Sequence, residues 1–431
     1  NLCRSVTNLF DGRCKFEICI ALSRKRSRME EKMKIAMMTN NYKPFVAGVP
    51  ISIERLAEGL RRQGHHVVVF APDYDGQNWE PDVVRYGSLL KGVAGGASVP
   101  NSLDFEIERR FKEGNFDVIH VHHPMMIGRT AGYLSWKYHV PLVFTYHTRY
   151  EQYLHYIGMS GLKKVMPAYV RGYTKHCDMV IAPTPLMKDY LDKIRTEAEV
   201  RVLPTGLPEE SFYPDKEKAG QIRKNLLGDK KYLFCTVARL AKEKNLDFLL
   251  RSMKLLKEEW GSNFRLALIG DGPSRKELER KAVLYGINEE ILFVGKVPNS
   301  EIKNYCHASD LFLFSSLSET QGIVLLESMA AGTPVVALHA TGTEDVVING
   351  KNGYMTRESE MEFDKKIMDI LEKREIDLLR QGACETARNY CCEKITEDAV
   401  KTYMQAIWNR REKDRIRHGN RNQRKDMVYS G

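Results

Sequence analysis

The sequence predicts an α/β protein made of two doubly wound, Rossmann-like domains that face each other across a cleft. Its 431 residues are enough for two separate hydrophobic cores. Apolar segments of strand length alternate with amphipathic segments of helix length, and this alternation, typical of parallel sheets, runs through the chain twice. A turn-rich segment, Val202–Pro214, separates the two runs and is interpreted as an interdomain linker.

In the first half the alternation begins with a strand at Lys34–Thr39, followed by the loop Asn40–Gly48. A helix is expected near Pro50–Gln63, because Pro50 suits a first helical turn and Gly64 suits the position just past the end. Further buried strands are expected at His66–Ala71, Asp117–His122, Leu142–His147 and Met179–Pro183.

In the second half a helix is expected to open at Gly322, and a last helix, about Ile395–Arg410, could cross back to the first domain. The expected strands are Tyr232–Val237, Phe264–Gly270, Ile291–Val294, Asp310–Ser316 and Pro334–Leu338. The predicted organisation is therefore an extension outside the fold (1–33), two domains (34–204 and 205–394), the crossing helix (395–411) and a tail (412–431).

Composition narrows the class of protein. Charged residues at 28% and hydrophobic ones at 43% are typical of a soluble globular chain, and no apolar run is long enough to span a bilayer. Nine cysteines without metal-binding spacing indicate free thiols in a reducing cytosol. Of the net charge of +10, residues 1–34 carry +5 and residues 401–431 carry +6. Such ends are solvated tails or contact anionic membrane, and the aromatic–basic interleaving of nucleic-acid binders is absent.

Two carboxylates lie eight residues apart across a strand-to-helix junction. Glu319 follows the strand in a loop, and Glu327 lies on the next helix. Gly322 between them lets backbone N–H groups approach an anion at the helix N-terminus. A phosphate there, with a carboxylate on each side for sugar and ribose hydroxyls, suits a nucleotide sugar at the carboxyl edge of the sheet. The alternative is a buried helix beside a solvated glutamate.

The second half also carries cations and a tight turn at the same sheet edge. Arg239 and Lys244 follow its first strand, and two cations there can neutralise a diphosphate leaving group. A solvated basic loop is the alternative. The turn Gly270-Asp271-Gly272-Pro273 follows the second strand and suits a close approach of the backbone to a ligand, although alone it is a weak signal.

Histidines gather at the carboxyl edge of the first half. His147 ends a strand and could donate to a sugar hydroxyl, or be a core histidine satisfied by the backbone. A cluster one strand earlier raises the question of zinc, but it has no acidic or cysteine partner at ligand spacing, so no metal is expected. The first loop contains only Gly48, so the dinucleotide and P-loop fingerprints are both missing. The clustered residues are His120, His122 and His123.

The segment Leu162–Lys175 is basic and amphipathic, although Pro167 interrupts it. A helix lying on an anionic membrane has this pattern, and so does a half-buried helix of a soluble domain. Its apolar face comprises Leu162, Val165, Met166, Tyr169 and Tyr173, and its cations are Lys163, Lys164, Arg171 and Lys175.

Taken in order, these motifs resemble the family-4 retaining glycosyltransferases of GT-B fold over roughly residues 34–410. The resemblance rests on the Gly48 loop, His147, Arg239 with Lys244, Gly270–Pro273 and the Glu319/Glu327 pair. Within that family the chain looks most like bacterial diacylglycerol glucosyltransferases. The residues that carry this closer likeness are His122-His123-Pro124, Gly128-Arg129, Thr145–Tyr156 and Glu319-Thr320-Gln321-Gly322.

The resemblance implies a hexosyltransferase that moves glucose from UDP-glucose to diacylglycerol or glycosyl-diacylglycerol, with retention and without a metal cofactor. Residues 34–204 would then form the acceptor domain and 205–394 the nucleotide-sugar domain. The implied partners are the nucleotide sugar, the lipid and an anionic membrane at the inner face of the plasma membrane, with no nucleic acid. A soluble or polyprenyl-linked glycan acceptor, or a non-catalytic nucleotide-sugar binder, are the alternatives.

The resemblance also assigns roles to matching positions. Arg239 and Lys244 would hold the diphosphate, while His147 and Glu319 contact the donor sugar. Glu327 would bind the ribose. In the Gly48 loop, Ala47 precedes Gly48, where many members of the family have a second glycine. The remaining implied donor contacts are Gly270, Asp271, Gly272, Val297 by the base, and Gln321, Gly322 and Ile323.

Overall fold

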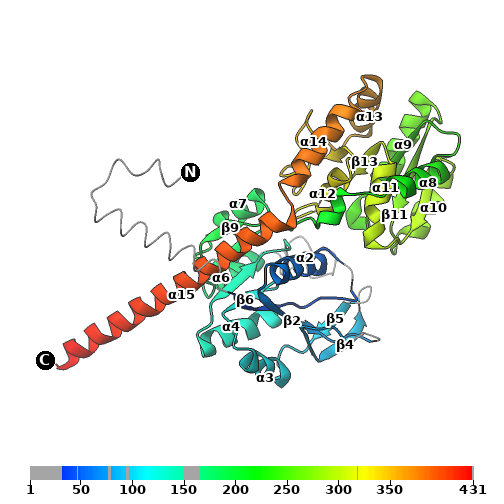
Figure 1. Ribbon diagram of the computed structural model, residues 1–431. Coiled ribbons are helices and arrows are strands. Elements are labelled where there is room, and N and C mark those ends of the chain that lie inside the picture. Colours follow the sequence, from blue (N-terminus) through cyan, green and yellow to red (C-terminus); the bar gives the residue numbers. More distant parts are fainter. Residues whose placement is uncertain are drawn as a thin grey trace, which may run out of the picture.

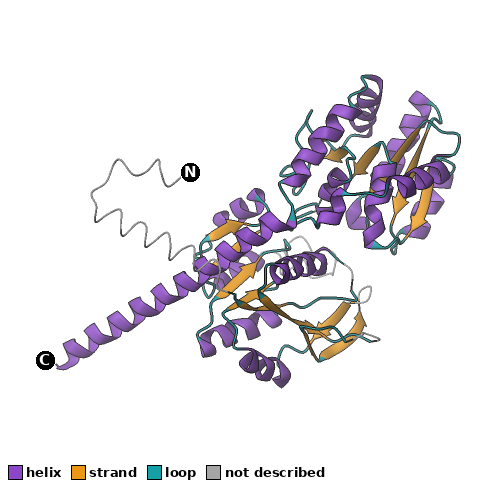
Figure 2. Cartoon of the chain, viewed as in Figure 1, coloured by secondary structure: helices purple, strands orange, loops and turns teal. Residues whose placement is uncertain are grey.

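The computed structural model contains two α/β domains joined at a narrow waist (Figure 1). It describes residues 32–45, 47–75, 79–93, 97–149, 165–317 and 319–429. The predicted extension 1–33 therefore lies almost wholly outside the described residues. Each domain has a parallel sheet with helices on its faces (Figure 2), which confirms the predicted pair of Rossmann-like domains.

The N-terminal sheet has seven parallel strands in the order β3-β2-β1-β6-β7-β8-β9. These are β1 (Lys34–Met38), β2 (His66–Pro72), β3 (Val83–Tyr86), β6 (Val118–Val121), β7 (Leu142–Thr145), β8 (Met179–Ala182) and β9 (Val200–Val202). An antiparallel hairpin, β4 (Ser88–Val93) and β5 (Ala97–Pro100), is added beside β2. The helices are α2 (Gly48–Arg62), α3 (Phe105–Gly114), α4 (Ile127–Tyr138), α6 (Met166–Thr174) and α7 (Pro185–Lys193).

The C-terminal sheet has six parallel strands in the order β12-β11-β10-β13-β14-β15. They are β10 (Tyr232–Val237), β11 (Phe264–Ile269), β12 (Ile291–Gly295), β13 (Leu311–Phe314), β14 (Val335–Leu338) and β15 (Gly353–Thr356). Its α-helices are α8 (Lys216–Leu227), α9 (Leu246–Trp260), α10 (Arg275–Leu284), α11 (Ile302–Ala308), α12 (Ile323–Ala330), α13 (Glu360–Glu372) and α14 (Ile376–Arg388). Short 3-10 turns are η2 (Glu209–Phe212), η3 (Lys242–Lys244) and η4 (Asn299–Glu301).

The central strands of both sheets are buried on both faces, which explains their continuous apolar sequences. In each sheet the strand order reverses beside the first strand, between β1 and β6 and between β10 and β13. Ligands of open parallel sheets bind beyond the carboxyl ends of the strands at such a reversal. At the first reversal, His122 and His123 follow β6. At the second reversal, Arg239 and Lys244 follow β10, and Glu319 follows β13.

The predicted strands were found with ends shifted by at most two residues. Five other strands were not predicted: β3, β4, β5, β9 and β15. They have three to six residues, and the exposed residues of β4 and the half-buried ones of β3 and β9 interrupt the apolar pattern. The predicted linker Val202–Pro214 includes the last residue of β9 and the 3-10 turn η2.

The last helix, α15 (Cys392–Tyr429), is far longer than the predicted Ile395–Arg410. It leaves the C-terminal domain, crosses the N-terminal domain and extends past it (Figure 1). The helix continues through the segment predicted as a basic tail, 412–431, as far as Tyr429. Apolar residues hold the crossing part against α2 and the N-terminal sheet: Ile395, Ala399, Val400, Tyr403 and Ala406.

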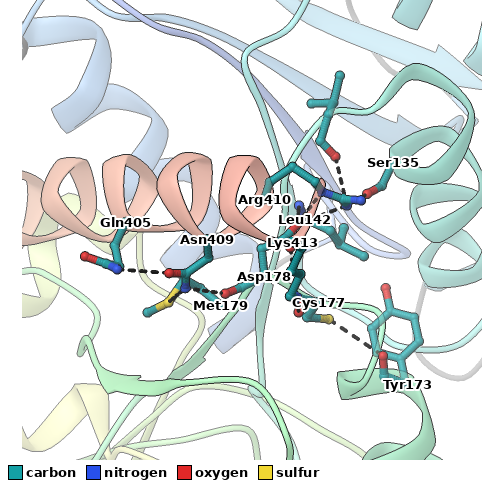
Figure 3. A network of polar contacts seen from close by, with 11 residues as sticks. Ser135, Leu142, Tyr173, Cys177, Asp178, Met179, Gln405, Asn409, Arg410 and Lys413 are labelled. Carbon is teal, nitrogen blue, oxygen red and sulfur yellow. Dashed lines mark hydrogen bonds and ion pairs between the residues drawn. The ribbon is translucent and has the colours of Figure 1, made fainter. Parts of the chain in front are cut away.

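A buried carboxylate anchors α15 to the N-terminal domain (Figure 3). Asp178, whose side chain is 1% exposed, accepts hydrogen bonds from Arg410 Nε and Lys413 Nζ, each at 3.0 Å. The backbone N–H of Leu142 donates to the same carboxylate at 2.9 Å. A buried charge with several charge-assisted donors is satisfied, so this network fixes the helix position.

The chain crosses between the domains twice, and the two crossings hydrogen-bond to each other. Leu207 N donates to Tyr390 O at 2.7 Å, and Cys392 N donates to Leu207 O at 2.9 Å. A Cβ atom on Gly206 would lie 2.9 Å from the Cα and Sγ atoms of Cys392, so only glycine fits there. The waist is therefore a paired, closely packed connection.

Candidate active site

Lys244 and Glu319 meet at the carboxyl edge of the C-terminal sheet. Lys244 lies in η3 after β10, and Glu319 lies in the loop after β13. Lys244 Nζ donates to Glu319 Oε1, and Ser316 Oγ donates to the same oxygen at 3.0 Å. The two side chains are 25% and 21% exposed, so a ligand can reach the pair. The structure thus brings together two residues that lie 75 positions apart in the sequence.

Arg239 lies exposed in the loop after β10, and the Gly270–Pro273 turn holds that loop in place. A Cβ atom on Gly270 would lie 2.0 Å from Ala238 O, and one on Gly272 would lie 2.4 Å from Leu240 O. Leu240 N donates to Asp271 O at 3.1 Å. The two glycines are therefore required for the contact between two protein loops, and their approach to a ligand stays a prediction.

The start of α12 has the expected glycine geometry. Gly322 is the N-cap residue and has a φ of 64°, a left-handed conformation that favours glycine. Gly342, which the sequence analysis missed, packs on the preceding loop. A Cβ atom there would lie 2.7 Å from Glu319 O. Its position shortly after β14, at the same sheet edge, was the available signal. Together these glycines fix the backbone that carries Glu319.

Four other residues were predicted as donor contacts, and the side chains of three of them contact the protein itself. The side chain of Gln321 is buried and bonds the linker, accepting from Thr205 N at 2.8 Å and donating to Thr205 O at 3.2 Å. Glu327 forms an ion pair with Arg55 of α2, a residue that the sequence analysis did not select. Val297, after β12, packs partly buried against the core of the C-terminal domain. Ile323 is the first residue of α12 and is half-buried.

In the N-terminal domain the predicted strand Leu142–His147 ends at Thr145, and His147 follows in the loop. His122 follows β6, and its Nδ1 atom lies 2.9 Å from His147 Nε2. Burial lowers the pKa of both rings well below the usual 6.5, and the neighbouring histidines lower it further. Both rings are therefore neutral near pH 7, which suits hydrogen bonding to a sugar.

The other two histidines of the cluster are structural. His120 contacts Tyr403 Oη of α15 at 2.8 Å through Nδ1 and Thr145 Oγ1 at 2.6 Å through Nε2. His123 accepts from the backbone N–H of Asn40 at 3.2 Å. Burial lowers their pKa values to about 3 and about 4. Within the described residues, no three His, Cys, Asp or Glu side chains converge as metal ligands.

Gly48 begins α2, close to the histidine edge of the N-terminal domain. Its φ is not positive, and nothing in the described protein lies within 4 Å of the place where a Cβ atom would be. Unlike the glycines of the C-terminal domain, it is not required by contacts of the described chain with itself. It stays a predicted donor contact.

The basic amphipathic segment is described only in part. Leu162, Lys163 and Lys164 lie outside the described residues. The rest forms α6, where Met166 and Tyr173 are buried while Arg171 and Lys175 are exposed. Lys175 pairs with Glu197 at 2.8 Å. Within the described part of the chain, none of the helices is both long and apolar enough to cross a membrane.

Two sequence families match the chain in succession. Residues 46–211 match the family described as Glycosyltransferase Family 4, and residues 217–389 match the one described as Glycosyl transferases group 1. An alpha-monoglucosyldiacylglycerol synthase of Streptococcus pneumoniae is 33% identical over 324 residues, which are 71% of this chain and 71% of that protein. This chain is a family-4 glycosyltransferase.

Further relatives of this glycosyltransferase agree in class and fold. An alpha-monoglucosyldiacylglycerol synthase of Acholeplasma laidlawii is 28% identical over 392 residues, covering 87% of this chain and 98% of that protein. The crystal structure of HepE from Anabaena in complex with UDP is 18% identical, with a TM-score of 0.70, 86% of this chain covered and 99% of that one. The matches confirm the GT-B fold and the predicted hexosyltransferase class.

Proposed function

We propose that the glycosyltransferase moves glucose from UDP-glucose to diacylglycerol or a glycosyl-diacylglycerol at an anionic membrane surface. The observation that carries the proposal is the Lys244–Glu319 pair at the carboxyl edge of the C-terminal sheet. A cation and a carboxylate there match the diphosphate and the sugar of a nucleotide sugar. The lipid acceptor is supported by two relatives named alpha-monoglucosyldiacylglycerol synthase.

In this proposal Lys244 and Arg239 stabilise the departing diphosphate. Arg239 is exposed on a loop held by the Gly270–Pro273 turn, so its position is fixed while its guanidinium is accessible. Lys244 exchanges the Glu319 carboxylate for a phosphate oxygen. Because negative charge grows on the diphosphate as the sugar leaves, fixed cations lower the barrier more than they strengthen donor binding.

The same exchange frees Glu319 to accept hydrogen bonds from hydroxyls of the donor sugar. His147, which is neutral, contacts the sugar from the N-terminal domain. The acceptor hydroxyl attacks the face from which the diphosphate departs, and the leaving phosphate takes its proton, so the anomeric configuration is retained. No metal is expected as a cofactor, because two cations already serve the diphosphate.

The membrane surface is the remaining part of the proposal. Exposed Arg171 on α6 and Lys175 just after it are available to anionic headgroups, and the end of α15 is rich in basic residues. Basic residues near a surface each add about 1 kcal/mol of attraction to anionic lipid. We therefore propose a peripheral enzyme on the cytoplasmic face of the plasma membrane.

The test is transfer of radiolabelled sugar to diacylglycerol in mixed micelles with anionic lipid, using UDP-glucose, UDP-galactose and GDP-mannose in parallel. Labelled lipid from UDP-glucose, lost in Lys244→Ala and kept in Lys242→Ala, supports the proposal. Lys242 is a matched control, because it is an exposed cation of the same 3-10 turn.

Other outcomes redirect or overturn the proposal. Slow hydrolysis of UDP-glucose without labelled lipid would move the acceptor to a soluble or polyprenyl-linked glycan. Activity that survives in Lys244→Ala would remove this residue from the site.

A further inference from the structure

The His122–His147 contact has a geometry that restricts where hydrogen atoms can be. His122 Nδ1 and His147 Nε2 lie 2.9 Å apart, and the two rings stack with centroids 5.1 Å apart and planes inclined by 27°. His122 is 1% exposed, whereas His147 is partly exposed. The ring of His120 packs against the ring of His122, with centroids 4.2 Å apart. The plane of His122 is therefore held from within the domain.

The contact must share a single hydrogen atom. Because the pKa of each ring lies well below 6.5, both are neutral imidazoles near pH 7, and each carries one N–H group. Two bare nitrogens facing each other would repel, and two N–H groups would clash. One ring therefore donates to the other, and two arrangements remain.

The two arrangements differ at the buried Nε2 atom of His122, which carries a hydrogen in one and is bare in the other. If His147 donates from Nε2, His122 must carry its hydrogen on Nε2, which has no hydrogen-bond partner among the described residues. If His122 donates from Nδ1, its buried Nε2 is a bare acceptor, and His147 carries an N–H on Nδ1. Buried N–H groups without partners are rarer in proteins than unsatisfied acceptors. The second arrangement is therefore favoured.

His122 also lines a small cavity with mixed walls. Its apolar part comprises Leu56, Ile181, Pro183, Leu203, Pro204 and Ile395, and its polar part includes Ser52, Arg55, Thr145, Thr205 and Thr396. None of these polar side chains hydrogen-bonds to His122 Nε2, so an N–H at this atom would have no acceptor among the described residues.

We propose that His122 is a positioning residue that holds His147 in the Nδ1–H tautomer, so that His147 presents an N–H donor to an oxygen of the donor sugar. The role of His147 toward the sugar rests on the proposed function. The tautomer itself rests on the distance between the two rings, on their neutral state and on the unpartnered Nε2 atom of His122, and it can be measured without substrate.

The first test is long-range ¹H–¹⁵N NMR of the full chain with ¹⁵N-labelled histidine, at pH 7 without donor. Spectra of His122→Asn and His147→Asn assign the signals. We expect the protonated-nitrogen shift at Nδ1 of both rings and the bare-nitrogen shift at Nε2 of both. A protonated Nε2 on His147 would overturn the proposal, whether or not the chain transfers glucose.

The second test compares two substitutions that place an amide at different ring positions. His122→Asn puts its NH₂ group near the place of Nδ1 and can still donate to His147, whereas His122→Gln places it near Nε2. We expect His122→Gln to lower kcat/KM for UDP-glucose by about tenfold, the value of one lost hydrogen bond, and His122→Asn by much less. Equal losses in both, tracking their thermal stability, would show a structural role only.

Discussion

Arg55 of α2 forms an ion pair with Glu327 of α12, so a helix of the N-terminal domain contacts the carboxylate assigned to the ribose. The two side chains are only 8% and 12% exposed. Arg55 reaches Glu327 Oε1, and its other terminal nitrogen lies 3.5 Å from Gly206 O at the waist. Arg55 therefore connects Glu327 and the linker to the N-terminal domain.

Replacing Arg55 by Ala is expected to lower the free energy of unfolding by about 3 kcal/mol, because it leaves the Glu327 carboxylate buried without its partner. It should also raise the KM for the donor, since the orientation of Glu327 is lost. The double variant Arg55→Ala/Glu327→Ala should be more stable than Arg55→Ala alone. Urea denaturation of the four proteins of this cycle measures the coupling, and additive effects would contradict a buried pair.

A comparison of Gly48→Ala with Gly270→Ala distinguishes a glycine predicted to contact the ligand from a glycine that contacts the protein. In Gly48→Ala the new Cβ atom meets nothing in the described chain, so stability should change by less than about 0.5 kcal/mol. If isothermal titration then showed a weaker affinity for UDP, the new Cβ atom would be in contact with the ligand and not with the protein.

Gly270→Ala is the contrasting variant. It combines a φ of 133° with a Cβ atom 2.0 Å from Ala238 O, so it should lower stability and displace the Arg239 loop. Unchanged UDP affinity in Gly48→Ala would remove Gly48 from the donor site, whatever Gly270→Ala shows.

The histidine cluster and His147 should make stability depend on pH. Burial lowers the pKa of all four rings below the usual 6.5 in the folded protein. As pH falls below about 6.5, the unfolded chain takes up protons that the folded chain takes up only at lower pH, so stability falls over this interval.

Urea denaturation at pH 7, 6 and 5 should show a loss of at least about 2 kcal/mol between the extremes. His176→Gln, at an exposed position, is the control and should leave the slope unchanged. A flat profile would mean that the four rings take up protons at the same pH in the folded and the unfolded chain, so that burial does not lower their pKa values.

Asp364 of α13 should contribute a slope of the opposite sign. Burial raises the pKa of this carboxyl to about 8, although Ser252 Oγ donates to it. Between about pH 4 and pH 8 the unfolded carboxyl is ionised while the folded one is protonated, so this group costs more stability as pH rises.

Asp364→Asn removes that cost, and its gain in Tm over wild type should therefore be larger at pH 8 than at pH 5. Asp369→Asn, on the same helix and partly exposed, is the matched control. A gain in Tm that is the same at both pH values would show that Asp364 is ionised in the folded protein.

Much of the fold could be predicted because the central strands are buried on both faces and therefore appear as short apolar runs. The strands that were missed lack this signal. β9 has only three residues, and β15 starts at Gly353, where a side chain would lie 2.1 Å from Val335 O. Such strands form because a neighbouring strand offers hydrogen-bond partners, which the local sequence does not record.

The candidate site was predicted where strand ends carry the chemistry, as with Lys244, Glu319 and His147. Arg55 was missed because an arginine within an amphipathic helix has the pattern of a solvated face, and its partner lies 272 residues away. The contact that the glycines of the Gly270–Pro273 turn make with the Arg239 loop was missed for a related reason. A position that only glycine can occupy looks the same in sequence whether a ligand or another loop comes close.

The anchoring of α15 has a consequence for synthesis and truncation. During translation the N-terminal domain emerges first, yet the partners of its buried His120 and Asp178 lie on residues 403–413. The domain therefore cannot finish folding until residues 403–413 have left the ribosome, and the C-terminal domain, which precedes them, is made while its neighbour is still incomplete. A premature stop anywhere before residue 413 removes part of the first domain, even though every strand of that domain has already been made.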